Sequence, residues 1–153
     1  MAAPLYDALL VCHLAAALIG FGAVAIGGWS AADGQKAASP RSDERLLRFF
    51  KPGRDWPSRL VLVVPVFGLA LLLGGDRSAI AHPWPWAGLF VWLVAAGHLL
   101  GLGWPAEHRA QQALAGGEGD LEEFRSACKK MERAAAVASV CFVAAVILMI
   151  WQP

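Results

Sequence analysis

The chain has 153 residues, the length of one domain, and we expect residues 1–153 to form a single unit. Hydrophobic residues make up 58% of the chain and charged residues only 16%, whereas about 25% is usual in soluble domains, so the composition indicates an integral membrane protein. A formal net charge of +1 argues against nucleic-acid binding, which requires a strongly basic face. Cys12, Cys128 and Cys141 form no C-x-x-C pair and indicate neither a disulfide nor a zinc site.

The first apolar segment, Leu5–Trp29, is long enough to span a bilayer. No Lys or Arg precedes it, so we expect a retained membrane helix rather than a cleaved signal peptide. His13 begins a series of small residues at alternating steps of three and four, namely Ala16, Gly20, Ala23 and Gly27. This spacing places them on one helix face, and glycine and alanine let a neighbouring helix approach closely. That face is therefore predicted to pack inside a bundle, with His13 pointing inward.

A polar segment separates the first span from the second. Within it, Ser42–Phe50 (SDERLLRFF) begins with a serine and two acidic residues and continues with leucine and phenylalanine among arginines. This pattern predicts a short amphipathic helix, capped by Ser42, that lies at the membrane surface. Leu60–Gly75 is the second predicted span, with a kink at Pro65.

The third span has the clearest boundaries of the predicted helices. Pro85–Pro105 contains no charged side chain, and at helical rise its length is about 30 Å, the thickness of the hydrocarbon core. We expect the helix over 85–104 to end at the flanking prolines, with the rings of Trp84, Trp86 and Trp104 in the headgroup layers. His98 lies within Gly97-x-x-x-Gly101, a spacing that favours close helix packing.

The last part of the chain predicts a second polar connection and a fourth span. Gly116–Gly119 (GGEG) indicates a flexible break, and Asp120 is expected to cap a helix that begins charged and continues as the span 134–151. The sequence therefore predicts an all-α fold, a bundle of four transmembrane helices with a short amphipathic cytoplasmic helix between the first two.

Basic residues are distributed unevenly among the three connections. Seven lie in 30–59 and five in 106–133, but only Arg77 lies in 76–83. The positive-inside rule places the first two segments in the cytoplasm and both termini outside. We therefore expect a multi-pass protein of the bacterial inner membrane with periplasmic N- and C-termini.

Two histidines, His13 and His98, lie inside predicted spans, where ionisable residues are functional candidates. Imidazole ligates haem iron, but two ligands of one iron need the same depth, and these residues are offset by about 15 Å at helical rise. A site shared by both would therefore need an unusual tilt. Ligation of haem b or of a chlorin magnesium by one histidine stays open, as does proton transfer. A structural hydrogen bond to a neighbouring helix is the favoured interpretation.

A charged cluster, Glu107, His108 and Arg109, directly follows Pro105. These residues could form a compact site at the cytoplasmic corner, although side chains that extend toward the lipid headgroups explain them more simply. The sequence contains no phosphate-binding glycine loop, no H-E-x-x-H motif and no nucleophile–base pair. We therefore assign no catalytic residue and no metal site, and a non-enzyme is favoured.

The chain resembles the bacterial membrane proteins grouped as DUF2269. The likeness consists of a short outer N-terminus, a glycine-rich first helix with a histidine, and the corner Trp104-Pro105-x-Glu107-x-Arg109. The matching residues are His13, Gly20, Gly22, Pro105, Glu107 and Arg109. The resemblance implies an integral membrane protein without implying a particular activity.

More distantly, the layout is similar to that of the HemJ-type protoporphyrinogen oxidase and the CopD copper-resistance proteins. In the HemJ type, histidines of the first and third helices are implicated in haem binding, which would correspond to His13 and His98. A basic residue that the HemJ type has within its third span is missing here, which argues against the oxidase activity.

These observations favour an accessory or assembly subunit that packs against a larger membrane complex, with a respiratory or photosynthetic electron-transfer complex as the first candidate. Small residues on more than one helix and the lack of a catalytic constellation support this interpretation. The alternative is a haem-b-binding redox protein that uses His13 or His98. The expected partners are other membrane subunits and bound lipids.

Overall fold

The computed structural model describes residues 3–53, 56–75, 77–116 and 120–152, and none of these lies in a strand. The predicted all-α fold is therefore confirmed. Most of the predicted break at Gly116–Gly119 lies outside the described residues, as does Arg54. In chain order the elements are α1 (Ala3–Lys36), the 3₁₀ turn η1 (Pro40–Ser42), α2 (Glu44–Phe49), the 3₁₀ helix η2 (Trp56–Val63), α3 (Val64–Gly74), the 3₁₀ helix η3 (Arg77–Ala81), α4 (Pro83–His98), the π-helix η4 (Leu99–Gly103), α5 (Trp104–Ala115) and α6 (Leu121–Trp151).

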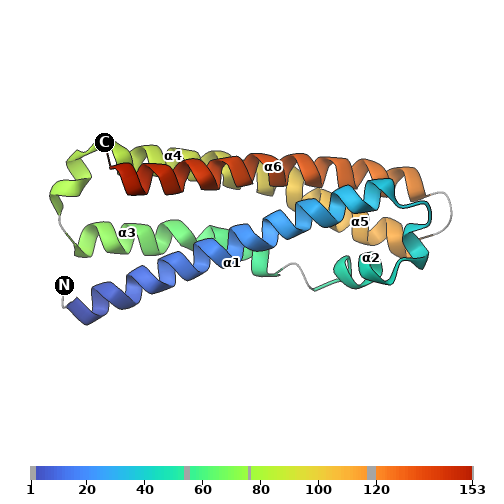
Figure 1. Ribbon diagram of the computed structural model, residues 1–153, viewed down its shortest axis with the longest axis horizontal. Helices are drawn as coiled ribbons and strands as arrows, with labels where there is room; N and C mark the ends of the chain where they lie inside the picture. Colours follow the sequence, from blue (N-terminus) through green and yellow to red (C-terminus); the bar gives the residue numbers. More distant parts are fainter. Residues whose placement is uncertain (1–2, 54–55, 76, 117–119, 153) are drawn as a thin grey trace.

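Four helical rods run side by side along the long axis of the molecule (Figure 1). Each is long and apolar enough to cross a membrane: Ala3–Lys36, Trp56–Gly74, Pro83–Ala115 and Leu121–Trp151. Both termini and η3 lie at one end, and α2 and α5 lie at the other (Figure 1). The four-helix bundle and its multi-pass character are thus confirmed.

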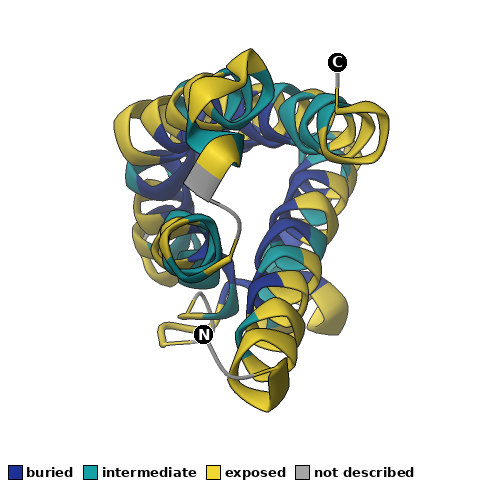
Figure 2. Ribbon diagram, turned by 90° about the vertical axis from the view of Figure 1, so that its left-hand side faces the viewer, coloured by how far each residue is buried: buried dark blue, intermediate teal, exposed yellow. Residues whose placement is uncertain are grey.

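The outer surface of the bundle carries large apolar side chains. Buried residues line mainly the inner sides of the helices, and exposed residues the outer sides (Figure 2). Ile150, Val140 and Phe90 are each at least two-thirds exposed. Such a surface would be unfavourable in water, but hydrocarbon chains are as apolar as these side chains. The distribution fits a protein that lipid surrounds.

The inner face of α1 consists largely of small residues. Its buried positions are His13, Ala16, Gly20, Phe21, Val24, Gly27, Gly28, Ala31 and Gly34. A Cβ added to Gly20 would lie 2.7 Å from the backbone nitrogen of Val61 in η2, and one added to Gly28 would lie 2.6 Å from the Cβ of Ala135 in α6. The helix axes can approach this closely because no side chain lies between them.

The second span differs from the prediction at Pro65. This proline stands in the first turn of α3, and the residues before it, Trp56–Val63, form a 3₁₀ helix. The first turn of an α-helix needs no backbone donor, so proline is tolerated there without a kink in the helix interior. The span consequently begins at Trp56 rather than at Leu60.

The third span does not end at Pro105, as the sequence had suggested. The Trp104 N–H donates to the carbonyl of Leu99, five residues earlier, in the π-helix η4. In a regular α-helix the proline ring would collide with the carbonyl four residues before it, and the wider π turn gives the chain another path. The helix therefore passes through the proline and continues to Ala115.

The short helix between the first two spans, α2, is confirmed, and Leu46 and the following Phe50 pack on protein, whereas Leu47 is exposed. Its N-cap is Asp43, whose side chain accepts the N–H groups of Arg45 and Leu46, rather than Ser42. Leu46 is buried, and the buried ring of Phe50 meets that of Phe124 in α6 edge-on at 5.4 Å. They belong to a core at this end of the bundle that consists of Ala31, Leu46, Phe50, Ala106, Ala110, Ala113, Phe124, Ala127, Cys128 and Met131.

The N-terminus of α6 also differs in detail from the prediction. Asp120 occupies the N-cap position, but its side chain makes no capping hydrogen bond there. The acidic residues Glu122 and Glu123 stand in the first turn, where negative charge is favourable. Packing of Phe124 in the end core fixes this terminus instead.

We predict that the two polar connections lie on one side of the membrane and η3 on the other. Reporter fusions after Ala38 and after Ala115 should give the same signal, and the excess of basic residues there favours the cytoplasm. A fusion after Ala79 should give the opposite signal. Alkaline phosphatase and green fluorescent protein fusions measure this, and matching signals at Ala79 and Ala115 would contradict the four-span arrangement.

Candidate functional site

His13 forms a hydrogen bond between two spans. Its Nδ1 lies 3.0 Å from the carbonyl oxygen of Val64 at the start of α3. A carbonyl can only accept, so Nδ1 carries the proton and, in the neutral ring, Nε2 carries the lone pair. The side chain is buried, and a Cβ added to Gly68 would lie 3.2 Å from its Cε1. His13 therefore fixes α1 to α3.

Three spans meet at Val61, which is fully buried. Gly20 of α1 packs on its backbone, and the indole Nε1 of Trp92 in α4 donates to its carbonyl at 2.8 Å. Val61 lies in the 3₁₀ helix η2, whose own hydrogen bonds join residues three apart, and a carbonyl oxygen can accept a second donor. The Trp92 indole is such a donor and joins η2 to α4.

His98, at the end of α4, is half-buried and bonds within its own helix. Its Nδ1 lies 2.9 Å from the carbonyl oxygen of Val94, one turn earlier. This nitrogen does not make the predicted hydrogen bond to a facing helix, and His13 is the histidine that bonds a neighbouring span. Beside His98, Gly97 and Gly101 are exposed, and a Cβ added to either would meet no described atom within 4 Å.

The structure does not bring the two histidines together. Trp92 and Val61 lie at the same level, because they are hydrogen-bonded. His98 lies six residues beyond Trp92 toward the end that carries α5, whereas Val64 lies three residues beyond Val61 toward the termini. The offset is about 14 Å at helical rise, too far for one metal ion to bind both rings. Each ring on its own keeps Nε2 available.

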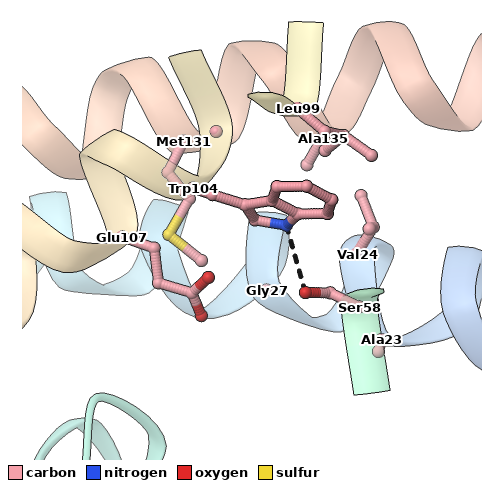
Figure 3. A pocket seen from close by; sticks show the side chains of 10 residues that line it. Ala23, Val24, Gly27, Ser58, Leu99, Trp104, Glu107, Met131 and Ala135 are labelled. Carbon is pink, nitrogen blue, oxygen red and sulfur yellow. Dashed lines mark hydrogen bonds between the residues drawn. The ribbon is translucent and has the colours of Figure 1, made fainter. Parts of the chain in front are cut away.

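A polar cluster lies where η2 meets the start of α5 (Figure 3). Trp104 Nε1 donates to Ser58 Oγ at 3.1 Å, and the guanidinium carbon of Arg59 lies 4.0 Å from the centroid of the Trp104 ring. The indole is 8% exposed, so it faces the bundle interior rather than the headgroup layer predicted for it. Of the two tryptophans predicted near the other end of that span, Trp86 is exposed and Trp84 is half-buried.

Glu107 lies one turn after Trp104 on the same face of α5 and is buried. Its carboxylate points into a small cavity of about 30 Å³ bounded also by Trp104 and Met131 (Figure 3). The other lining residues are mostly apolar, and a cavity of this size is about as large as one water molecule and too small for an organic ligand. His108 and Arg109 are exposed, and His108 Nε2 contacts Gln112 Nε2 at 3.2 Å.

The three residues of the predicted corner therefore separate. Glu107 lines the cavity together with Ser58 and Trp104, while its two neighbours face outward. No motif singled out Ser58 and Arg59, although a helical spacing of three relates Glu107 to Trp104. Among the described residues, no three His, Cys, Asp or Glu side chains group so that they could hold a metal ion.

No family model matches the chain, and no curated protein and no solved structure matches it. The likeness to DUF2269, and the more distant one to the HemJ and CopD types, therefore stays a prediction from the short motifs around His13 and Glu107. The geometry of the site carries the argument about function instead.

We predict that Gly20→Ala destabilises the protein by about 1–3 kcal/mol. The new methyl group would lie 2.7 Å from the Val61 nitrogen, and backbone cannot rotate away as a side chain can. Gly22→Ala is the matched control, since a Cβ at Gly22 meets no described atom within 4 Å. Thermal unfolding in detergent, followed by circular dichroism, measures both. Equal melting temperatures for the two variants would contradict the close approach of α1 to η2.

Proposed function

We propose that this chain is a small accessory or assembly subunit that packs against a transmembrane helix of a larger membrane complex through the outer face of α4. The observation that carries the proposal is the open surface at Gly97 and Gly101, where an added Cβ would meet no described atom within 4 Å. In α1, by contrast, Gly20 and Gly28 lie directly against neighbouring elements. A glycine pair four residues apart permits close approach of a helix, and this pair, Gly97 in α4 and Gly101 in η4, faces no other segment of the described chain.

The side chains around the glycine pair give the surface its shape. Leu93, one turn before Gly97, and Leu100, between the two glycines in the sequence, are each 53% exposed. Leucines beside glycines form ridges next to a shallow depression, into which the ridge of another helix can pack. Lipid chains gain little from such a depression, whereas a helix gains close van der Waals contact over several turns.

The π-helix adds a polar requirement to the same surface. The Trp104 N–H bonds the Leu99 carbonyl, and the next donor in that pattern, for the Leu100 carbonyl, would be residue 105. Residue 105 is a proline and has no N–H. Hydrocarbon offers no substitute donor, but a serine, threonine, asparagine or tryptophan on a partner helix does. The proposed partner therefore combines small residues with a hydrogen-bond donor.

The location that we propose is the inner membrane, with the polar end of the bundle in the cytoplasm. Twelve basic residues in the two connections at that end, against one in the η3 turn, support this orientation. The described residues offer nothing specific to electron transfer or photosynthesis, so the proposal does not specify the host complex.

The proposal predicts that Gly97→Leu together with Gly101→Leu releases the chain from its complex while leaving its own fold intact. The isobutyl groups would fill the depression, and we expect the co-purified fraction to fall about tenfold or more after mild solubilisation of native membranes. Gly88→Leu is the control, because Gly88 lies on α4 and a Cβ there is equally unobstructed. A complex that survives the double variant, or a wild-type chain that migrates alone, would contradict the proposal.

A second candidate, a haem-b- or chlorin-binding redox protein, is supported by the hydrogen bond of His98. Histidines that ligate metals commonly donate one ring N–H to a backbone carbonyl and present the other nitrogen to the metal. His98 Nδ1 contacts the Val94 carbonyl in this way, and the open glycines beside it leave room for a flat macrocycle. Ligation by His98 alone is compatible with this geometry, and a bis-histidine site with His13 is not.

An absorption spectrum of the natively purified complex distinguishes the two candidates. For an accessory subunit we expect no Soret or chlorin band from this chain, and His98→Gln should be tolerated because glutamine keeps a donor and an acceptor. A band that disappears in His98→Gln would decide for the redox protein.

A further inference from the structure

A second surface of the molecule, remote in sequence from Gly97 and Gly101, contains a groove with charged walls. A groove of about 290 Å³ lies between the end of the apolar part of α1 and the short helix α2, and it is lined by Ser30, Glu44, Arg45, Arg48 and Phe49. We propose that this groove binds the phosphate headgroup of an anionic phospholipid.

The position of the groove along α1 corresponds to the membrane surface. Trp29, immediately before Ser30, is 74% exposed, and exposed indole rings in membrane proteins concentrate at the headgroup layer. The apolar stretch of α1 ends at this tryptophan, and the polar residues Ser30, Asp33 and Lys36 follow. The groove therefore opens at the level of the lipid phosphates.

The charges in the groove are complementary to one phosphodiester. Arg45 and Arg48 lie one turn apart on α2, and Glu44 contributes one carboxylate, which leaves the lining with one net positive charge. No described residue pairs with either guanidinium group, so both are available. Guanidinium groups bind phosphate oxygens through two parallel hydrogen bonds, and the Ser30 hydroxyl is a further donor.

The surface below the groove suits an acyl chain. Ile26 and Ile19 precede Ser30 on the same side of α1, one and three turns earlier, and both are more than half exposed. Phe49 supplies an apolar wall beside the arginines. A phospholipid with its phosphate at Arg45 and Arg48 could thus place an acyl chain in contact with these apolar side chains. A free phosphate ion has no apolar part that could make this contact. This continuity favours a lipid as the occupant.

Native mass spectrometry of the full chain in detergent micelles, doped with phosphatidylglycerol or with phosphatidylcholine, tests the proposal. We expect one phosphatidylglycerol to stay bound, with a preference of about tenfold or more over phosphatidylcholine. Arg45→Gln together with Arg48→Gln should abolish this preference. The control, Lys130→Gln with Arg133→Gln, removes the same charge from exposed positions on α6 outside the groove and should leave the preference intact.

Ser30→Leu provides a second variant that obstructs the groove without a change of charge, and it should also weaken binding. Loss of the preference in the α6 control as well, or its survival in both groove variants, would show that diffuse charge attracts the lipid and would overturn the proposal. Displacement of phosphatidylglycerol by millimolar inorganic phosphate would likewise overturn it, because the site would then accept the ion without the lipid.

Discussion

The arrangement of the bundle depends on a contact that involves backbone more than side chains, the approach of Gly20 to Val61. The second span is the shortest of the four, and eight of its 19 residues form a 3₁₀ helix. It stays in place because α1 touches its backbone directly and the Trp92 indole bonds its Val61 carbonyl. His13 adds a second polar link one turn further along. Lipid chains cannot form hydrogen bonds, so they do not compete with these links between helices. The links therefore fix the position of the second span and also stabilise the bundle.

Two prolines are accommodated by a change of helix type beside them. Pro65 follows the 3₁₀ helix η2 and stands in the first turn of α3, where no backbone donor is needed. Pro105 follows the π-helix η4, in which the Trp104 N–H bonds the Leu99 carbonyl. In both places a local change in the helical hydrogen-bond pattern lets the chain pass a residue that has no N–H.

The four spans could be predicted because the length and the apolar composition of a segment are read from that segment alone. In hydrocarbon such a segment has to form a helix, because its backbone N–H and C=O groups must pair with each other. The small-residue spacing in α1 likewise indicated a buried face, and its members are buried apart from the half-buried Ala23. The errors have two causes. A 3₁₀ helix stands before Pro65 instead of the predicted kink, and a π-helix carries the chain past Pro105 instead of the predicted end. The inward position of Trp104 and the packing of α2 on Phe124 depend on contacts between distant segments. The polar cluster at the start of α5 was harder to predict than the spans. Ser58 and Arg59 belong to it only because they contact the indole of Trp104, which is distant in the sequence.

The π-helix at Leu99–Gly103 also bears on how the chain tolerates changes of length. A π turn accommodates about one more residue than an α turn does. It therefore resembles a one-residue insertion that the helix takes up locally, without rotating the residues that follow. Upstream of it Gly97 faces outward, and downstream of it Trp104 and Glu107 face inward. Because each residue of an α-helix advances the azimuth by about 100°, a single-codon insertion or deletion within these five residues would rotate the rest of the helix by about 100° and turn Trp104 and Glu107 away from their present contacts. Substitution at the same positions would leave the two faces where they are.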